Sequence, residues 1–194
     1  MMNREAIFKD LLKDQPGIYV EIGTCWGGWA EWLRKNTPCQ QLITVDPYKK
    51  YPQSEYYDAL NEMSQQDMDE KHRRVKARLE PQGIVVARDT SYGAAQHIPD
   101  GVLTFCYIDG NHLYHAVLQD LVLWWPKIKK GGYLCGDDVE DINKLHDAEG
   151  NLLVIHQQGS YGKYGVAKAL KDFAKACPDF KYKIVLNQFI AKKE

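Results

Sequence analysis

The chain has 194 residues, which is enough for one domain with a sizeable buried core. Lys and Arg number 25 and Asp and Glu number 26, so the formal net charge is −1, which argues against a nucleic-acid binder that works through bulk positive charge. Hydrophobic residues make up 44% and charged residues 26%, a balance that excludes the composition typical of disorder.

Short β-rich runs alternate with helical patterns along the chain, which is typical of βαβ units around a parallel sheet. Apolar periodicity predicts helices over 4–14, 26–35 and 113–128 and a further helix marked by Val166, Leu170 and Phe173. A basic turn and a glycine pair, residues 129–132, are expected to end the third of these helices. Strands are predicted over 18–22, 42–45, 83–87, 103–108 and 133–135, with a closing antiparallel segment over 180–190 around Asn187.

Two stretches depart from this alternation. Residues 54–80 mix charges of both signs and carry few apolar positions, so we expect one or two solvated helices that lie over the top of the sheet as a lid. Residues 139–162 are polar and are predicted to form a long loop, which in a compact domain is usually functional or disordered.

Carboxylates gather where the predicted strands end. The five strands are followed by Gly23, Asp46, Arg88-Asp89, Asp109-Gly110 and Asp137-Asp138. In open α/β sheets ligands bind outside the carboxyl ends of the strands. The sequence therefore predicts a functional site at this edge.

The first of these turns, from Glu21 to Gly28, is rich in glycine. Its G-x-x-x-G-G spacing differs from the G-x-G-x-x-G pattern of nicotinamide dinucleotide proteins, so we expect an adenosine-type ligand without phosphates. Asp46, at the end of the second strand, can accept hydrogen bonds from both ribose hydroxyls of such a ligand. Asp89 and Thr90 follow the third strand and are candidates for contact with the adenine ring.

Three further carboxylates, Asp109, Asp137 and Asp138, end two predicted neighbouring strands. Converging carboxylates repel unless a cation or a proton intervenes, and oxygen ligands without thiolates point to Mg²⁺, Mn²⁺ or, less well, Ca²⁺. His112 stands three residues after Asp109, where a neutral imidazole could take a proton from a substrate hydroxyl.

Five motifs follow one another between about residues 17 and 176. They are E-x-G-x-x-x-G-G, V-D-P, Y-I-D-G-N-H-x-Y, D-L-x-x-W-W-P-K-x-K-x-G-G-x-x-x-G-D-D and Y-G-V-x-K-A. In this order they resemble the class I S-adenosylmethionine-dependent methyltransferases. The resemblance is strongest to the small single-domain group that contains metal-dependent sugar O-methyltransferases.

The resemblance implies a Rossmann-like α/β fold, with a seven-stranded mostly parallel sheet, one antiparallel strand near the carboxyl end, and helices on both faces. It implies a single domain over 1–194, with a cofactor-binding first half over 17–50, a helical lid over 51–82, and the remainder of the sheet with the metal and acceptor site over 83–194. The implied cofactor-binding residues are Glu21, Gly23, Thr24, Gly27, Gly28, Asp46, Asp89, Thr90 and Asp109.

In metal-dependent members of the family, three ligands match Asp109, Asp137 and Asp138. In catechol-type members the base stands three residues after the first ligand, a position held here by His112. In macrolide-sugar and aminocoumarin-sugar members an Asp two residues after that ligand acts as base. The corresponding residue here is Asn111, which cannot, so the resemblance leaves the base undecided between these patterns.

The implied activity is transfer of a methyl group from S-adenosylmethionine to a hydroxyl, assisted by Mg²⁺ or Mn²⁺. An acidic, polar site favours a sugar hydroxyl, for example of a deoxysugar such as rhamnose on a glycan, with a catechol-like or other small-molecule acceptor as the alternative. A nicotinamide-dependent oxidoreductase and a non-catalytic adenosine-ligand-binding module are the hypotheses from other classes. A nucleic-acid partner is not expected, and a homodimer stays open.

No stretch approaches 18 consecutive apolar residues and residues 1–17 are charged throughout, so neither a transmembrane helix nor a signal peptide is expected. The five cysteines are odd in number and no pair has C-x-x-C spacing. This pattern favours reduced thiols and a cytoplasmic protein without a zinc site of recognisable spacing.

Overall fold

The computed structural model describes residues 3–52, 63–139, 152–155 and 161–194. The helices are α1 (Arg4–Leu12), α2 (Gly28–Asn36), α3 (Gln65–Leu79), α4 (Ser91–Ala95), α5 (Tyr114–Trp124) and α6 (Val166–Ala176), with a 3-10 turn at Glu80–Gln82. The strands are β1 (Gly17–Ile22), β2 (Cys39–Val45), β3 (Ile84–Ala87), β4 (Leu103–Ile108), β5 (Ile128–Gly136), β6 (Leu152–Ile155), β7 (Tyr161–Tyr164), β8 (Tyr182–Val185) and β9 (Gln188–Lys192).

Seven strands form one sheet in the order β3-β2-β1-β4-β5-β9-β8. The pairs from β3 to β5 are parallel, whereas β9 runs antiparallel to both β5 and β8. This is the seven-stranded sheet with one antiparallel strand that the sequence resemblance implies, and it confirms the predicted fold. The chain reverses between β8 and β9 at Leu186 and Asn187, which both have positive φ, so the predicted turn at Asn187 is confirmed as well.

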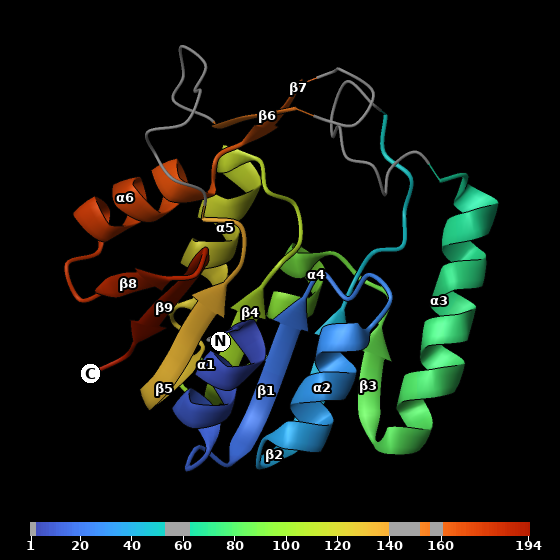
Figure 1. Ribbon diagram of the computed structural model, residues 1–194, viewed down its shortest axis with the longest axis horizontal. Helices are drawn as coiled ribbons and strands as arrows, with labels where there is room; N and C mark the ends of the chain where they lie inside the picture. The colour runs from blue at the N-terminus through green and yellow to red at the C-terminus, as the bar shows by residue number, and fades with distance from the viewer. Residues whose placement is uncertain (1–2, 53–62, 140–151, 156–160) are drawn as a thin grey trace.

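Helices cover both faces of this sheet (Figure 1). On one face α1, α2 and α3 enclose an aromatic-rich core, in which the ring of Phe8 packs edge-on against Trp29, Phe105 and Tyr107. On the other face α4, α5 and α6 pack over β1, β4 and β5 around Trp124. Because the central strands are buried on both sides, their sequences are almost continuously apolar. The carboxyl ends of β1 to β5 therefore meet at one edge, held on a rigid scaffold.

The charged stretch after β2 forms a packed helix. Helix α3 begins at Ser64, whose side chain and that of Asp67 form a capping box, and it buries Met68, Lys71, Val75 and Leu79. It runs beside β3 along the sheet rather than across its carboxyl edge (Figure 1). The predicted helix is therefore confirmed for 65–79, but its predicted place over the top of the sheet is wrong there, and residues 53–62 lie outside the described part of the chain.

Two other boundaries differ from the prediction. Helix α5 ends at Trp124 and β5 begins at Ile128, because Pro126 interrupts the helix and residues 129–132, predicted as its basic end, belong to the strand. A register shift between Leu103 and Phe105 accommodates this early start of β5. The predicted loop over 139–162 contains β6 and part of β7, which pair as an antiparallel two-stranded sheet, and residues 140–151 and 156–160 lie outside the description. In the part of the chain described, no helix is long and apolar enough to cross a membrane.

Candidate functional site

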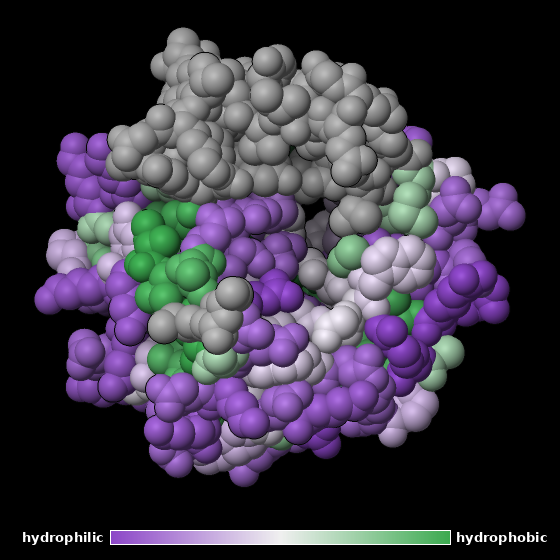
Figure 2. Space-filling view, in the orientation of Figure 1, coloured by the Kyte–Doolittle hydropathy of each residue, from purple (hydrophilic) through white to green (hydrophobic). Residues whose placement is uncertain are grey.

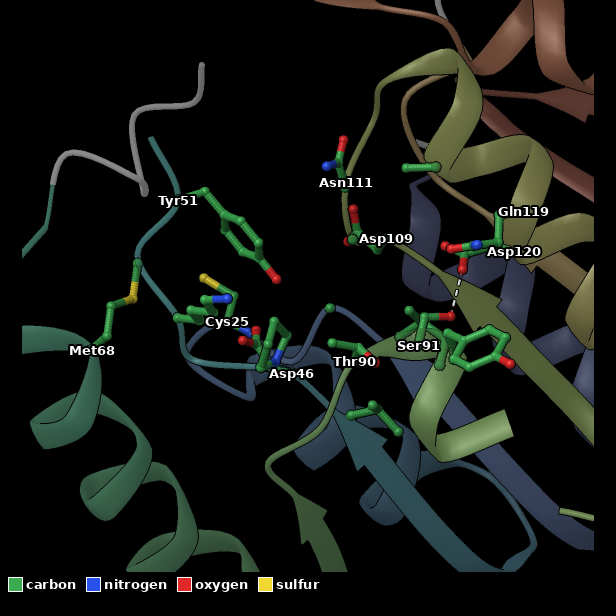
Figure 3. Close-up of a pocket in the computed structure, with 18 of the residues that line it drawn as sticks. Cys25, Asp46, Tyr51, Met68, Thr90, Ser91, Asp109, Asn111, Gln119 and Asp120 are labelled. Carbon is green, nitrogen blue, oxygen red and sulfur yellow. Dashed lines mark hydrogen bonds between the residues drawn. The ribbon is translucent and has the colours of Figure 1, made fainter. Parts of the chain in front are cut away.

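A cavity of about 370 Å³ lies at the carboxyl edge of the sheet. Figure 2 shows a hollow in an otherwise mostly hydrophilic surface at this edge. The wall comes from the turns after β1, β2, β3 and β4 and from one side of α5, and it includes Gly23, Cys25, Asp46, Thr90, Asp109 and Asn111. Figure 3 shows the side chains of Cys25, Asp46, Thr90, Asp109 and Asn111 around a common space. The residues that the sequence singles out at the ends of β1, β2 and β4 thus share one pocket, and Thr90, the candidate one residue further along after β3, joins them.

The turn after β1 needs glycine at its first position. Gly23 has a φ of +93°, and a Cβ there would lie 1.9 Å from the backbone oxygen of Asp109. The backbones of the β1 and β4 turns therefore touch, which draws the glycine turn and Asp109 to the same side of the pocket. A larger residue at this position would force the two turns apart.

Asp46 holds the turn after β2 and faces the pocket. One carboxylate oxygen accepts the backbone N–H of Cys25 at 2.9 Å, and the other accepts the backbone N–H of Tyr48 at 2.8 Å. Burial raises the pKa of this carboxyl above its ordinary value, and the two N–H donors oppose that rise. Each oxygen keeps a second acceptor position, so the side chain can still bind a ligand's hydroxyl groups from the position predicted for it.

Glu21 lies beneath the glycine turn and is 1% exposed. The hydroxyl of Thr44 donates to its carboxyl, and Thr24 contacts the same hydroxyl. Neither Glu21 nor Thr24 lines the cavity, so both support the turn from below in this structure. Burial raises the pKa of Glu21 to about 8, and the charges of Asp109 and Asp46 add to the rise.

The buried Glu21 makes stability depend on pH. Between about pH 4.5 and 8 the unfolded chain releases this proton while the folded chain retains it, so the free energy of unfolding falls as pH rises. The contribution is on the order of 3–5 kcal/mol across this interval. Glu21→Gln is expected to flatten that fall, which urea unfolding at pH 5 and pH 8 measures; equal slopes in the two proteins would contradict the assignment.

A second group lies at the ends of β4 and β5. Ligand atoms of Asp109, His112 and Asp138 all lie within 4.8 Å of one another. The Nε2 atom of His112 is 3.5 Å from Asp109 Oδ1 and 3.3 Å from Asp138 Oδ2. Burial raises the pKa of Asp109, and the charge of Asp137 raises it further. Two carboxylates and an imidazole at this spacing could hold a divalent cation.

Asp137 points elsewhere. Its carboxylate accepts hydrogen bonds from Nη1 of Arg4 at 2.8 Å and from the hydroxyl of Tyr107 at 3.3 Å. The side-chain amide of Gln188 donates a third hydrogen bond to it. The same Arg4 nitrogen is 3.9 Å from Asp109 Oδ2. The structure therefore pairs Asp137 with a cation from α1 and does not bring it into the group of potential metal ligands in which the sequence placed it.

Of the remaining predicted cofactor-binding residues, one lines the cavity and three lie outside its wall. Thr90 lines the cavity and caps α4 by accepting the backbone N–H of Gly93. Asp89 accepts the backbone N–H of Thr90 and stands outside the wall, as do Gly27 and Gly28 at the start of α2. Gly27 has positive φ and lies against Leu79, so it packs α2 on α3.

Several wall residues have no counterpart in the sequence prediction. Lys71 is 3% exposed, and its Nζ lies 3.4 Å from Cys25 Sγ and over the ring of Trp26. Ser91 and Asp120 form a hydrogen-bonded pair at another part of the wall. One signal for Asp120 was available, because a carboxylate interrupts the apolar periodicity of α5 on its buried side.

Comparison with known families agrees with this geometry. Residues 20–139 match the methyltransferase-domain family, so the chain belongs to it. Together with the sheet order, this places the chain among the class I S-adenosylmethionine-dependent methyltransferases, a family that implies S-adenosylmethionine as the cofactor.

Among individual proteins, the uncharacterised protein R132 of Acanthamoeba polyphaga mimivirus is 27% identical over 154 residues, which cover 75% of this chain and 63% of that protein. The chain thus spans less than two thirds of that relative's length. An O-methyltransferase from Bacillus cereus, solved with S-adenosylhomocysteine, has a TM-score of 0.59 at 13% identity over 96% of this chain and 76% of its own. An rRNA methylase from Streptococcus thermophilus has a TM-score of 0.57 at 10% identity over 100% and 98%. At these identities the solved structures show the shared fold.

Proposed function

We propose that this protein is an S-adenosylmethionine-dependent O-methyltransferase that uses a divalent metal and transfers the methyl group to a sugar hydroxyl. The observation that carries the proposal is the group formed by Asp109, His112 and Asp138, of which Asp109 lines the same pocket as Asp46. The family supplies the methyl donor, and this group supplies what activation of a hydroxyl requires.

The group fits a divalent ion of the Mg²⁺ or Mn²⁺ type. Asp109 and Asp138 offer carboxylate oxygens and no thiolate belongs to the group, while burial raises the pKa of Asp109 and the charge of Asp137 raises it further, so a cation would stabilise the ionised form. When bound, such an ion would orient the acceptor's oxygens and lower the pKa of its hydroxyl. Asp109 and Asp138 would hold it, while Asp137 keeps α1 in place through Arg4.

His112 is proposed as the group that takes the acceptor's proton. Its side chain is 12% exposed, and its Nε2 atom lies 3.5 Å from Asp109 Oδ1 and 3.3 Å from Asp138 Oδ2, beside the oxygens that would hold the metal. Asn111 lies on the pocket wall but accepts the backbone N–H of Leu113 and offers no basic atom. The chain's own contribution to the reaction is then alignment of donor and acceptor, exclusion of water, and removal of one proton.

A sugar acceptor is favoured by the character of the wall. Carboxylates and an amide lie beside the aromatic side chain of Tyr51, which points into the cavity (Figure 3). Polar groups next to an aromatic face suit a pyranose ring, whose hydroxyls need partners while its C–H face packs on the ring. A catechol-like phenol is the alternative acceptor, because it offers the same pair of neighbouring oxygens.

The test combines binding and turnover. Calorimetric titration with S-adenosylhomocysteine is expected to show micromolar binding, and transfer of labelled methyl from S-adenosylmethionine to a panel of sugars and catechols is expected only with Mg²⁺ or Mn²⁺ present. Transfer that is equally fast in a chelator would contradict the metal-assisted mechanism. Binding without transfer to any hydroxyl would favour a cofactor-binding module, and binding of NAD in place of S-adenosylhomocysteine would favour an oxidoreductase.

A further inference from the structure

The order of the strands sets the order of the parts of the pocket. Asp109 follows β4, Gly23 follows β1, Asp46 follows β2, and Ser91 begins α4 after the turn that follows β3, so these residues belong to strands in the order β4-β1-β2-β3. This inference rests on the proposed function. If the reacting end of the cofactor faces Asp109 and its ribose faces Asp46, its adenine extends toward the turn after β3.

A buried carboxyl group, that of Asp120, lies beside Ser91 at this part of the pocket. Asp120, on α5, is 4% exposed and lines the cavity. Its carboxyl accepts a hydrogen bond from the hydroxyl of Ser91 (Figure 3). The indole N–H of Trp124 donates to the same hydroxyl oxygen at 2.8 Å. Since an indole nitrogen can only donate, the single proton of Ser91 must point to Asp120. The two residues therefore hold the carboxyl in one orientation.

Among the described residues, no Lys, Arg or His lies within ion-pair distance of Asp120, and Ser91 is its one hydrogen-bond partner. Burial raises its pKa to about 7. The neighbouring buried positions of α5, Val117, Leu121 and Trp124, are apolar, and packing alone would favour an apolar residue at 120 too. A carboxyl retained at a pocket wall without a counter-charge suggests a ligand partner.

We propose that Asp120, oriented by Ser91 and Trp124, recognises the 6-amino group of the cofactor's adenine. The carboxyl oxygen that Ser91 does not occupy accepts one of the two amine protons. Both protonation states of the carboxyl retain an oxygen able to accept, so the contact does not depend on full ionisation. A 6-oxo base would instead set two acceptor oxygens against each other when the carboxyl is ionised, so ionised Asp120 selects adenine over hypoxanthine. A protonated carboxyl could donate to the 6-oxo oxygen, so binding is compared at pH 8, above the pKa of Asp120.

The experiment compares S-adenosylhomocysteine with S-inosylhomocysteine, which carries a 6-oxo group, by calorimetric titration. The wild-type protein is expected to bind the adenine compound at least about tenfold more tightly. Asp120→Asn is nearly the same size and presents an amide that can donate to the 6-oxo group, so it is expected to remove or reverse this preference. An unchanged ratio in Asp120→Asn would overturn the proposal, as would equal binding of both compounds by the wild type.

A matched control is available on α6, where Asp172 also accepts a hydroxyl, that of Tyr114, at 3.0 Å but lies outside the cavity wall. Asp172→Asn is expected to keep the wild-type ratio. If the wild type binds neither compound, the proposed methyltransferase function fails and this inference fails with it. If the wild type binds both compounds with equal affinity, the function stands and only the role of Asp120 is rejected. The wild-type comparison needs no variant, so a poorly folding Asp120→Asn would not prevent a decision.

Discussion

Replacing Asp46 by asparagine is expected to weaken S-adenosylhomocysteine binding by about 30-fold or more. The carboxylate is the acceptor that faces the pocket at the end of β2, and hydrogen bonds to a charged acceptor contribute about 1.5–3 kcal/mol. An amide offers one oxygen in place of two and cannot accept from two ribose hydroxyls and two backbone N–H groups together. Calorimetric titration of both proteins measures the difference.

The same carboxylate holds Cys25 and Tyr48 by their backbone N–H groups, so loss of binding alone could come from a displaced turn. An analogue of S-adenosylhomocysteine that lacks both ribose hydroxyls separates the two effects. If Asp46 binds the ribose, the wild type loses affinity for this analogue and Asp46→Asn barely distinguishes the two compounds. A variant that still discriminates as strongly as the wild type would show that Asp46 acts only on the turn.

The second large effect concerns the metal. Asp109→Asn is expected to lower Mn²⁺ affinity by at least about a hundredfold, because it removes a charged ligand from the Asp109, His112 and Asp138 group. Electron paramagnetic resonance of free Mn²⁺ measures this affinity without an acceptor substrate. Asp109 also lines the cavity, so S-adenosylhomocysteine binding is measured alongside to show that the pocket remains formed.

The matched control is Asp137→Asn, directly after the end of the adjacent strand β5. In the structure this carboxylate is bound to Arg4 and Tyr107, so its substitution is expected to affect Mn²⁺ binding far less than substitution of Asp109. Unfolding should become easier, since Arg4 would lose its main partner. Equal losses of Mn²⁺ affinity in the two variants would restore the ligand set implied by the sequence resemblance and require Arg4 to move away when metal binds.

The layout of the fold was readable from the sequence because its signals are local. The buried parallel strands are marked by short apolar runs, and a glycine or an acidic residue lies within two residues after each, so the order of elements and the edge that carries the site both follow from pattern. The β8–β9 reversal was readable for the same reason, because Asn187 tolerates the positive φ that a tight turn requires.

The sequence could not predict where a side chain points when its orientation depends on a partner from a distant part of the chain. Asp137 and Asp138 are neighbours, yet Arg4 engages one while His112 faces the other, and nothing in their spacing distinguishes them. In α3 the charges conceal a buried side because Met68, Val75 and Leu79 are its only buried apolar residues, and the aliphatic chain of Lys71 completes that side. Thus the positions of the strand ends were predictable, and the partners at those ends were not.

The contact between Arg4 and Asp137 links the detachment of helix α1 to the binding of a cation at the strand ends. Helix α1 is nine residues long and is anchored by Phe8 and Leu12, so its detachment is a local opening rather than global unfolding. Detachment would withdraw a guanidinium from Asp137 and Asp109, leaving negative charge uncompensated. Any cation that binds at the strand ends offsets that cost, and by reciprocity a docked α1 weakens such binding. Amide exchange in α1 should therefore report occupancy of a site to which the helix contributes no ligand.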